Sequence, residues 1–440
     1  MPIPCAVRVR SLLKTLSETG FFSIAGSTIV NRILSFISGI LVVRILSKAD
    51  YGVYSYAYNI LNIALLFNGL GVASAFIQLC SERGGNKKER ALERFGMALG
   101  GGFDLLLSLG LFLWATLVPE DMPGTRALLQ LCALFPIPQF IFDMQSAALR
   151  SQLRNNDYAM SNIVNTACIV VGTILGALLF GVVGLLVCRV VAICVSVVII
   201  FIRYGVPLML KRETASSDAS TVLPSHERRD YVKIATSSAL ANGISSFTFL
   251  IGTFMIGQLL ADPVEVASYE AASAIPVALN FIPATIMVYV YPYFARRNDD
   301  YPWVRRNFVR LLALTFAGFG VIALICLIWA PQIVELVYGA QYLSSAPAFR
   351  VLIVGSWVGA AFRTVSGNLL VTQRLVIANV INAAITVLAI LSLNLPLVPT
   401  MGAMGSAIAQ TVGLCLSGLL NTAVFTATIN QREKRTRHAA

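Results

Sequence analysis

Two short stretches of this 440-residue sequence repeat each other: SNIVNTACIVVG at Ser161–Gly172 and ANVINAAITVLA at Ala378–Ala389. The second follows the first by 217 positions, and at that shift the two asparagines of each stretch coincide. Repetition across half a chain is the pattern of a duplicated unit. These stretches therefore predict a molecule built from two similar halves.

Two further matches occur at nearly the same shift. GVVG at Gly181–Gly184 corresponds to GAMG at Gly402–Gly405, and Tyr54 corresponds to Tyr269. Three matches in register favour a duplicated six-span unit, an arrangement common in secondary transporters, whose substrate sites lie between the repeats.

The composition identifies the environment of these halves. Hydrophobic residues make up 57% of the chain and charged residues only 12%, which is typical of an integral membrane protein. Apolar stretches of about 20 residues, the length that crosses a bilayer, number twelve. They run over residues 21–46, 53–80, 95–118, 127–149, 159–180, 182–202, 234–260, 268–294, 308–330, 347–370, 376–395 and 402–428. The fifth and sixth are separated only by the glycine turn at Gly181–Gly184.

Charge in the connections indicates the orientation. About 26 of the 33 Lys and Arg residues fall on one side, and only Lys48 and Arg126 fall on the other. The positive-inside rule then places both termini in the cytoplasm, and it also explains the net charge of +12 without nucleic acid. The basic run near Lys87 and the basic tail favour contact with anionic membrane lipids. The N-terminal 20 residues lack the apolar core of a cleavable signal peptide.

A hydrophilic segment divides the chain. Residues 204–233 are rich in Ser, Glu and Arg and predict a cytoplasmic linker. We expect an N-terminal six-helix half at 1–203 and a C-terminal six-helix half at 234–440 that ends in a short basic tail. The predicted fold is all-α and polytopic, with about twelve transmembrane helices in two pseudo-symmetric six-helix bundles around a central cavity.

The segments Arg44–Gln78 and Ile275–Arg297, with the paired asparagine repeats, resemble the polysaccharide-transporter family, which includes Wzx-type O-antigen flippases. Its superfamily also contains multidrug and toxic-compound extrusion (MATE) transporters and lipid II flippases. The resemblance implies a MATE-like fold in the bacterial inner membrane. It also implies a flippase, not an enzyme, that moves a polyprenyl-diphosphate-linked oligosaccharide to the outer leaflet for O-antigen, capsule or exopolysaccharide synthesis. A polymerase and chain-length machinery would be its partners.

Arginines inside the predicted spans are candidate ligands for such a headgroup. Arg32, Arg189 and Arg363 each lie several residues from either end of a span, where a charge costs about 2.5 to 3.5 kcal/mol on insertion scales. A guanidinium group presents a forked set of donors that fits phosphate oxygens. Thr28, Asn31 and Ser35 accompany Arg32 on a polar face that is suited to a hydrated cavity.

Only two acids, Asp104 and Asp143, are expected within the spans. They either neutralise arginines or couple transport to H+, Na+ or the membrane potential. Two carboxylates cannot neutralise three deep arginines, and the surplus of positive charge favours an anionic cargo.

The asparagine side chains on the repeated helices are compatible with two roles. Asn162, Asn165, Asn379 and Asn382 either line the cavity and bind sugar hydroxyls or hold neighbouring helices together.

Two other functions compete with the flippase. A cation-coupled multidrug exporter of the MATE type would be expected to carry more acids than bases in its spans. A polytopic membrane enzyme of polysaccharide assembly would need a long outer loop, but the longest one here is residues 331–346. Two histidines and eight scattered cysteines provide no metal-binding pattern, and no phosphate-binding GxxxxGK[ST] motif occurs. We expect no metal or cofactor.

Overall fold

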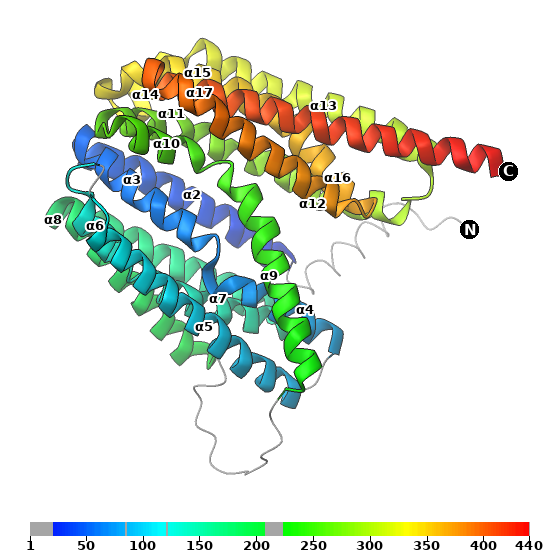
Figure 1. Cartoon of the computed structure of the whole chain (residues 1–440), viewed down its shortest axis with the longest axis horizontal. Coiled ribbons are helices and arrows are strands. Elements are labelled where there is room, and N and C mark those ends of the chain that lie inside the picture. Colours follow the sequence, from blue (N-terminus) through cyan, green and yellow to red (C-terminus); the bar gives the residue numbers. More distant parts are fainter. Residues whose placement is uncertain (1–20, 84–85, 120–121, 207–222, 440) are drawn as a thin grey trace. The chain divides into compact units, whose positions relative to one another are not determined.

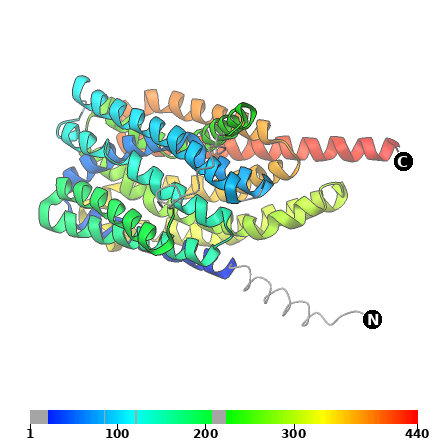
Figure 2. The ribbon, with the colours of Figure 1, turned by 90° about the horizontal axis from the view of Figure 1, so that it is seen from below.

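The computed structural model describes residues 21–83, 86–119, 122–206 and 223–439. Within these ranges every regular element is a helix (Figures 1 and 2). The expectation about an uncleaved N-terminus concerns residues 1–20, which lie outside the described part. The all-α prediction is confirmed.

The chain forms two compact units. Unit 1 takes Met1–Leu46, Ala64–Pro119 and Arg126–Leu240, and unit 2 takes Ser47–Ile63, Glu120–Thr125 and Ala241–Ala440. This partition is not the division at the linker that the sequence suggested, because α3 (Lys48–Leu65) lies largely in unit 2 and most of α9 (Ser225–Phe247) lies in unit 1. Residues 207–222 of the expected linker lie outside the described ranges.

The remaining elements belong mainly to one unit each. Unit 1 contains α2 (Phe21–Ile45), the 3-10 turn η1 (Asn68–Gly71), α4 (Val72–Arg83), α5 (Asn86–Leu117), α6 (Thr125–Cys132), α7 (Pro136–Ser151) and α8 (Asn155–Tyr204). Unit 2 contains α10 (Ile251–Leu260), α11 (Pro263–Leu279), α12 (Phe281–Arg296), α13 (Tyr301–Ile328), α14 (Ala330–Tyr338), η3 (Ala340–Ser345), α15 (Ala346–Val358), the π-helical η4 (Gly359–Thr364), α16 (Val365–Thr372) and α17 (Val376–Ala439).

The described residues contain nine helices long and apolar enough to span a membrane, or ten when α9 and α10, bent by 63°, count as one span. Two of the nine, within α8 and α17, are interrupted by a glycine with non-helical backbone angles. Each arm on either side exceeds the roughly 20 residues that cross a bilayer. Counted with each arm as one span, the described residues contain twelve segments long enough to cross a membrane, the number predicted.

The two interruptions are hairpins of the same kind. Gly181 has φ 62° and ψ −145°, and Gly402 has φ 58° and ψ −135°, a conformation that favours glycine. A Cβ on Gly176 would lie 2.3 Å from the Gly184 carbonyl oxygen, and one on Gly405 would lie 2.2 Å from the carbonyl oxygen of Leu397. The arms therefore pack backbone to backbone, and the motif matched at residues 181–184 and 402–405 forms the same turn in both repeats.

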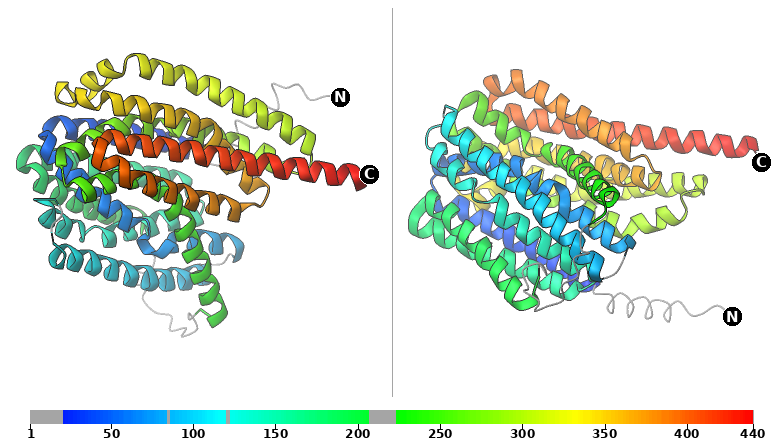
Figure 3. Two further views of the ribbon diagram at one scale, coloured as in Figure 1. Left: turned by 45° about the horizontal axis from the view of Figure 1, so that its top comes forward. Right: turned by 60° about the horizontal axis from the view of Figure 1, so that its bottom comes forward.

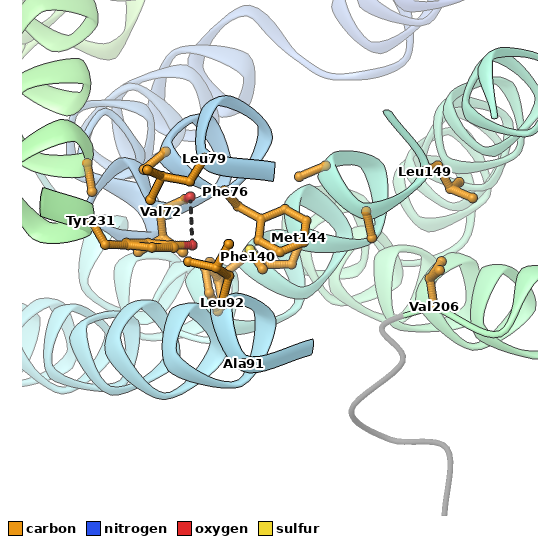
Figure 4. Close-up of a cluster of buried hydrophobic side chains, with 14 of the residues drawn as sticks. Val72, Phe76, Leu79, Ala91, Leu92, Phe140, Met144, Leu149, Val206 and Tyr231 are labelled. Carbon is orange, nitrogen blue, oxygen red and sulfur yellow. Dashed lines mark hydrogen bonds between the residues drawn. The ribbon is translucent and has the colours of Figure 1, made fainter. Parts of the chain in front are cut away.

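An apolar cluster holds α4, α5, α7 and the start of α9 together in unit 1. Phe76, Phe140 and Met144 are at most 2% exposed and pack against one another in its centre (Figure 4). The Tyr231 hydroxyl of α9 donates a hydrogen bond to the Val72 carbonyl oxygen at 3.2 Å (Figure 4). This bond satisfies a polar group that would otherwise be buried without a partner.

Unit 2 has its own core. Phe308 of α13 stacks obliquely on Phe425 of α17 with ring centroids 4.4 Å apart, and Leu369 and Leu370 of α16 close the cluster. The C-terminal part of α17 continues well beyond α15 and α16 (Figure 3). This extension contains Arg432 and Lys434, in agreement with a basic segment at the end of a span.

Candidate functional site

The second crossing of the chain is broken between α3 and α4. At the turn, Gly69, Leu70 and Gly71 all have positive φ values of 55°, 51° and 75°. Gly69 is required by packing as well, because a Cβ there would lie 2.4 Å from the ring of Phe140. Broken membrane helices expose backbone groups to side chains that line a site.

Asp104 of α5 uses one of these exposed groups. Its Oδ1 accepts a hydrogen bond from the Gly69 amide at 2.8 Å, and the residue is 0% exposed. Its Oδ2 is buried without a hydrogen-bond partner among the described residues. Only one of the two carboxylate oxygens of Asp104 therefore accepts a hydrogen bond from the described residues.

Asp143 of α7 lies at the same turn. Its Oδ2 accepts from the Asn68 amide at 2.8 Å and its Oδ1 accepts from Gln139 at 3.0 Å. The Asn68 carbonyl oxygen of the side chain is buried and, among the described residues, lacks a donor. Among the described residues, this turn therefore brings together two carboxylates with neutral hydrogen-bond donors and two buried acceptor atoms, Asp104 Oδ2 and Asn68 Oδ1, that lack a donor.

This arrangement bears on the two readings of the aspartates. No described arginine lies within ion-pair distance of Asp104 or Asp143. Direct neutralisation of a span arginine is therefore not what these side chains do in this structure. A role in coupling stays a prediction.

Arg32 lies near the middle of α2, which packs against α8. Its side chain is exposed, and no described residue hydrogen-bonds or ion-pairs with it. On the same face, Thr28 bonds its own helix at the Ile24 carbonyl, Ser35 is exposed, and the buried Asn31 Oδ1 has no donor among the described residues. An exposed guanidinium at this depth needs water or an anion rather than lipid.

Arg189 belongs to the second arm of α8, also in unit 1. Its guanidinium carbon lies 5.9 Å from the centre of the Phe135 ring, a cation-π contact. Arg189 and Arg32 both belong to unit 1.

Arg363 lies in unit 2 on the π-helical turn η4. Its Nη2 contacts the Ser245 carbonyl and hydroxyl oxygens at 3.4 and 3.5 Å, and the guanidinium lies 5.0 Å from the Phe249 ring centre. π-Helical turns are frequent at functional sites. Ser245 lies in the last turn of α9, and Phe249 lies in the bend between α9 and α10. Arg363, on the π-helical turn, therefore contacts the residues at this bend.

The repeated asparagines differ in what they contact. Asn165 accepts a 2.6 Å hydrogen bond from Ser196 across the α8 hairpin, and Asn382 donates a 2.8 Å bond to Asn421 across the α17 hairpin. These two hold helix arms together, the structural one of the two readings. Asn162 bonds back to the Tyr158 carbonyl of its own helix, and Asn379 is partly buried near Gly367.

The expectation that Asp104 and Asp143 are the only acids in the spans is wrong. Glu270 of α11 lies inside the membrane-spanning stretch Pro263–Arg296, where its carboxylate and the Thr253 hydroxyl are hydrogen-bonded. The signal was present in the sequence, because Glu270 is the third residue of the predicted span 268–294. One acid near the end of an otherwise apolar stretch leaves the stretch apolar enough to span a membrane, so the pattern does not draw attention to it.

Solved structures define the fold class. An inward-facing multidrug resistance MATE family transporter of the MOP superfamily superposes with a TM-score of 0.74 at 15% identity, covering 94% of this chain and 99% of the other. The lipid II flippase MurJ gives 0.69 at 12% identity, covering 90% and 86%. A MOP superfamily transporter from Pyrococcus furiosus gives 0.58 at 14% identity, covering 95% of each. The chain has the fold of MOP-superfamily transporters.

The family follows from the sequence itself. The family model described as "Polysaccharide biosynthesis protein" matches residues 41–347, which is more than half of the chain. The chain therefore belongs to this family of polysaccharide biosynthesis proteins and is a multi-pass membrane protein. Comparison with proteins of curated function gives no match.

Proposed function

We propose that this protein is a flippase that moves a polyprenyl-diphosphate-linked oligosaccharide from the cytoplasmic to the outer leaflet of a bacterial inner membrane, with both termini in the cytoplasm. Membership of the polysaccharide biosynthesis family supports the saccharide part of the cargo. The shared fold with a lipid II flippase supports a lipid-linked one. A polymerase and chain-length machinery would use the product.

The observation that carries the proposal is positive charge without a matching carboxylate. Arg32 is exposed within a span and has no ion-pair partner among the described residues, while Arg363 contacts the neutral Ser245 and Phe249. Charges at this depth are stable only beside water or a counter-charge. A diphosphate supplies that counter-charge, and its oxygens match the guanidinium fork.

We propose that Asp104 and Asp143 in unit 1 couple transport to the movement of an ion. Asp104 and Asp143 have only neutral donors, and Asp104 leaves an acceptor atom unfilled, so taking up H+ or Na+ there would lower the cost of burying their charge. Release of that ion on the other side of the membrane would give transport a direction. An anionic cargo would also respond to the membrane potential.

Complementation of a strain that lacks this gene tests the proposal. Arg32→Ala should abolish surface polysaccharide while the protein stays in the membrane at its normal level, and Arg32→Lys should keep part of the activity because the charge remains and the fork is lost. Arg44→Ala, at the end of α2, is the matched control and should have a smaller effect. Full polysaccharide production by Arg32→Ala would refute the role of this arginine.

The multidrug exporter is the alternative outcome. Such a protein would confer resistance to cationic drugs and would leave surface polysaccharide unchanged when deleted. In the P. furiosus transporter, a reverse polarity of the binding pocket suggests a different function. Pocket charge thus differs among proteins with this fold, which supports using charge to choose between the two cargoes.

A further inference from the structure

One face of α13 is exposed along the whole helix. Side chains at steps of three and four lie on the same side of a helix. Counted from Arg306, these steps give a stripe in which every residue is exposed: Arg306, Arg310, Ala313, Ala317, Val321, Leu324 and Ile328. Phe308, Thr315 and Phe319 lie on the other side and are buried in unit 2. The stripe therefore begins with two arginines and continues with apolar side chains.

The apolar part of this stripe fits the acyl chains of a bilayer. The helix Tyr301–Ile328 is long and apolar enough to cross a membrane. Val321, Leu324 and Ile328 are 60%, 51% and 64% exposed, so the described part of the chain leaves them largely uncovered. In a membrane, these side chains contact lipid.

Tryptophans at both ends of α13 place the arginines relative to the bilayer. Trp329 follows Trp303 by 26 positions, a rise of about 39 Å. A bilayer with its headgroup regions is about 40 to 45 Å thick, and tryptophans gather at its two interfaces. Arg306 and Arg310 lie one and two turns inward from Trp303, about 4.5 and 10 Å along the helix axis. They therefore lie at the level of the phosphate and glycerol groups of one leaflet.

The neighbouring charges at this end of α13 already have partners within the protein. Arg305 lies 3.5 Å from the Glu433 carboxylate of α17. The guanidinium carbon of Arg297 lies 5.0 Å from the centre of the Trp303 ring. Asp300 caps α13, since its Oδ1 accepts a hydrogen bond from the Trp303 amide at 3.1 Å. These contacts complete the turn without the two arginines of the stripe.

Arg306 and Arg310 have no such contacts. Within the residues that the structure describes, neither side chain has a hydrogen bond, an ion pair or an aromatic contact. Both guanidinium groups lie on the same side of α13, one turn apart, and an anion between them lowers their repulsion. A second copy of α13 would add two more positive charges, so this end of the stripe disfavours self-association.

We propose that Arg306 and Arg310 bind the phosphate of an anionic phospholipid, whose acyl chains lie along the apolar part of the stripe. A guanidinium group matches phosphate oxygens. Each basic residue near a membrane surface favours anionic lipid by roughly fivefold. A zwitterionic headgroup has the same phosphate but carries its own cation, so it gains less from two arginines. This lipid site requires only that the chain spans a membrane, and it is independent of the proposed cargo.

Quenching of Trp303 by brominated lipids tests this site in the full chain. The parent carries Trp114→Phe and Trp329→Phe. Trp357, whose ring stacks on Phe316, is kept, and its signal is subtracted by measuring Trp303→Phe in the same parent. The protein is reconstituted in phosphatidylcholine bilayers that contain rising fractions of phosphatidylglycerol or phosphatidylcholine brominated in the upper acyl chain. The ratio of the two quenching constants gives the preference for the anionic lipid.

We expect the parent to prefer phosphatidylglycerol by roughly five- to thirtyfold, with a factor of about five for each arginine. Arg306→Gln/Arg310→Gln should lose most of this preference. Arg229→Gln/Lys233→Gln removes two exposed basic residues one turn apart at the start of α9, so it is the matched control and should keep the preference. Equal quenching by the two lipids in the parent, or an unchanged preference in the double arginine variant, would overturn the proposal.

Two other occupants of the stripe would give different results. A second copy of the chain would keep both brominated lipids away, so weak quenching by either lipid, together with a dimer on size exclusion, would overturn the lipid site. Polyprenyl diphosphate, added at the same mole fraction as phosphatidylglycerol, should leave most of the quenching in place. Complete recovery of Trp303 fluorescence would instead assign the stripe to the cargo lipid and contradict the proposal.

Discussion

Asp104 allows the loss of charge to be separated from the loss of a hydrogen bond. Its Oδ1 accepts a hydrogen bond from the Gly69 amide at 2.8 Å, and three of the four residues of that turn have positive φ. Asp104→Asn keeps an oxygen that can accept this amide, whereas Asp104→Ala leaves the amide without a partner. A buried donor left unsatisfied costs about 1 to 3 kcal/mol. The alanine cavity adds to that cost.

We therefore expect Asp104→Ala to be less stable than Asp104→Asn by at least about 1 to 3 kcal/mol. Asp104→Asn itself should be as stable as wild type or more so, because it removes a buried charge that lacks a basic partner. Thermal unfolding of the purified variants in detergent, followed by tryptophan fluorescence, gives the order. Gly102→Ala, on the same helix with open space at its Cβ, is the control. Equal midpoints for the alanine and asparagine variants would refute the assigned role of the Gly69 bond.

Three other predictions concern the hairpins and the topology. Gly181→Ala should lower the free energy of unfolding by about 1 to 3 kcal/mol through backbone strain alone. Gly402→Ala should lower it by more, because its Cβ would also lie 2.3 Å from a Glu265 oxygen that accepts a backbone amide. Equal thermal midpoints for the two variants would contradict this difference. Asn382→Ala should lower stability by about 0.6 to 1.7 kcal/mol while polysaccharide production persists, since its bond joins the arms of α17; normal stability with lost production would instead favour a sugar-binding role. Reporter fusions at Asp262 and Asn298 should report the outer and cytoplasmic sides, respectively, and a consistent inversion would refute the orientation.

The crossings and the repeat could be predicted because their signals are local. Hydropathy and length mark each span, and the glycines at 181 and 402 mark turns that only a residue without a side chain adopts readily. The matched GVVG and GAMG motifs form the same glycine turn in both halves. The asparagine match was also real, but the sequence left two readings, and hydrogen bonds across the hairpins decided for Asn165 and Asn382.

The candidate sites could be predicted only in part, because they depend on contacts between distant helices. Nothing in the sequence around Asp104 indicates that a backbone amide 35 positions earlier becomes its donor. The breaks near Gly69 and between α9 and α10 interrupt apolar stretches without a charge or proline to mark them. Glu270 stands in the sequence of a predicted span, but its hydrogen bond with Thr253 joins two different helices, which the sequence does not indicate.

Flipping of a labelled polyprenyl-diphosphate oligosaccharide in proteoliposomes tests the central claim most directly. Purified protein is reconstituted with the labelled lipid, and the fraction accessible to a membrane-impermeant reagent is followed over time. We expect wild type to accelerate exchange between leaflets and Arg32→Ala to fall to the rate of protein-free vesicles. Exchange no faster with wild type than without protein, or equally fast with Arg32→Ala, would contradict a flippase that recognises its anionic cargo through this arginine.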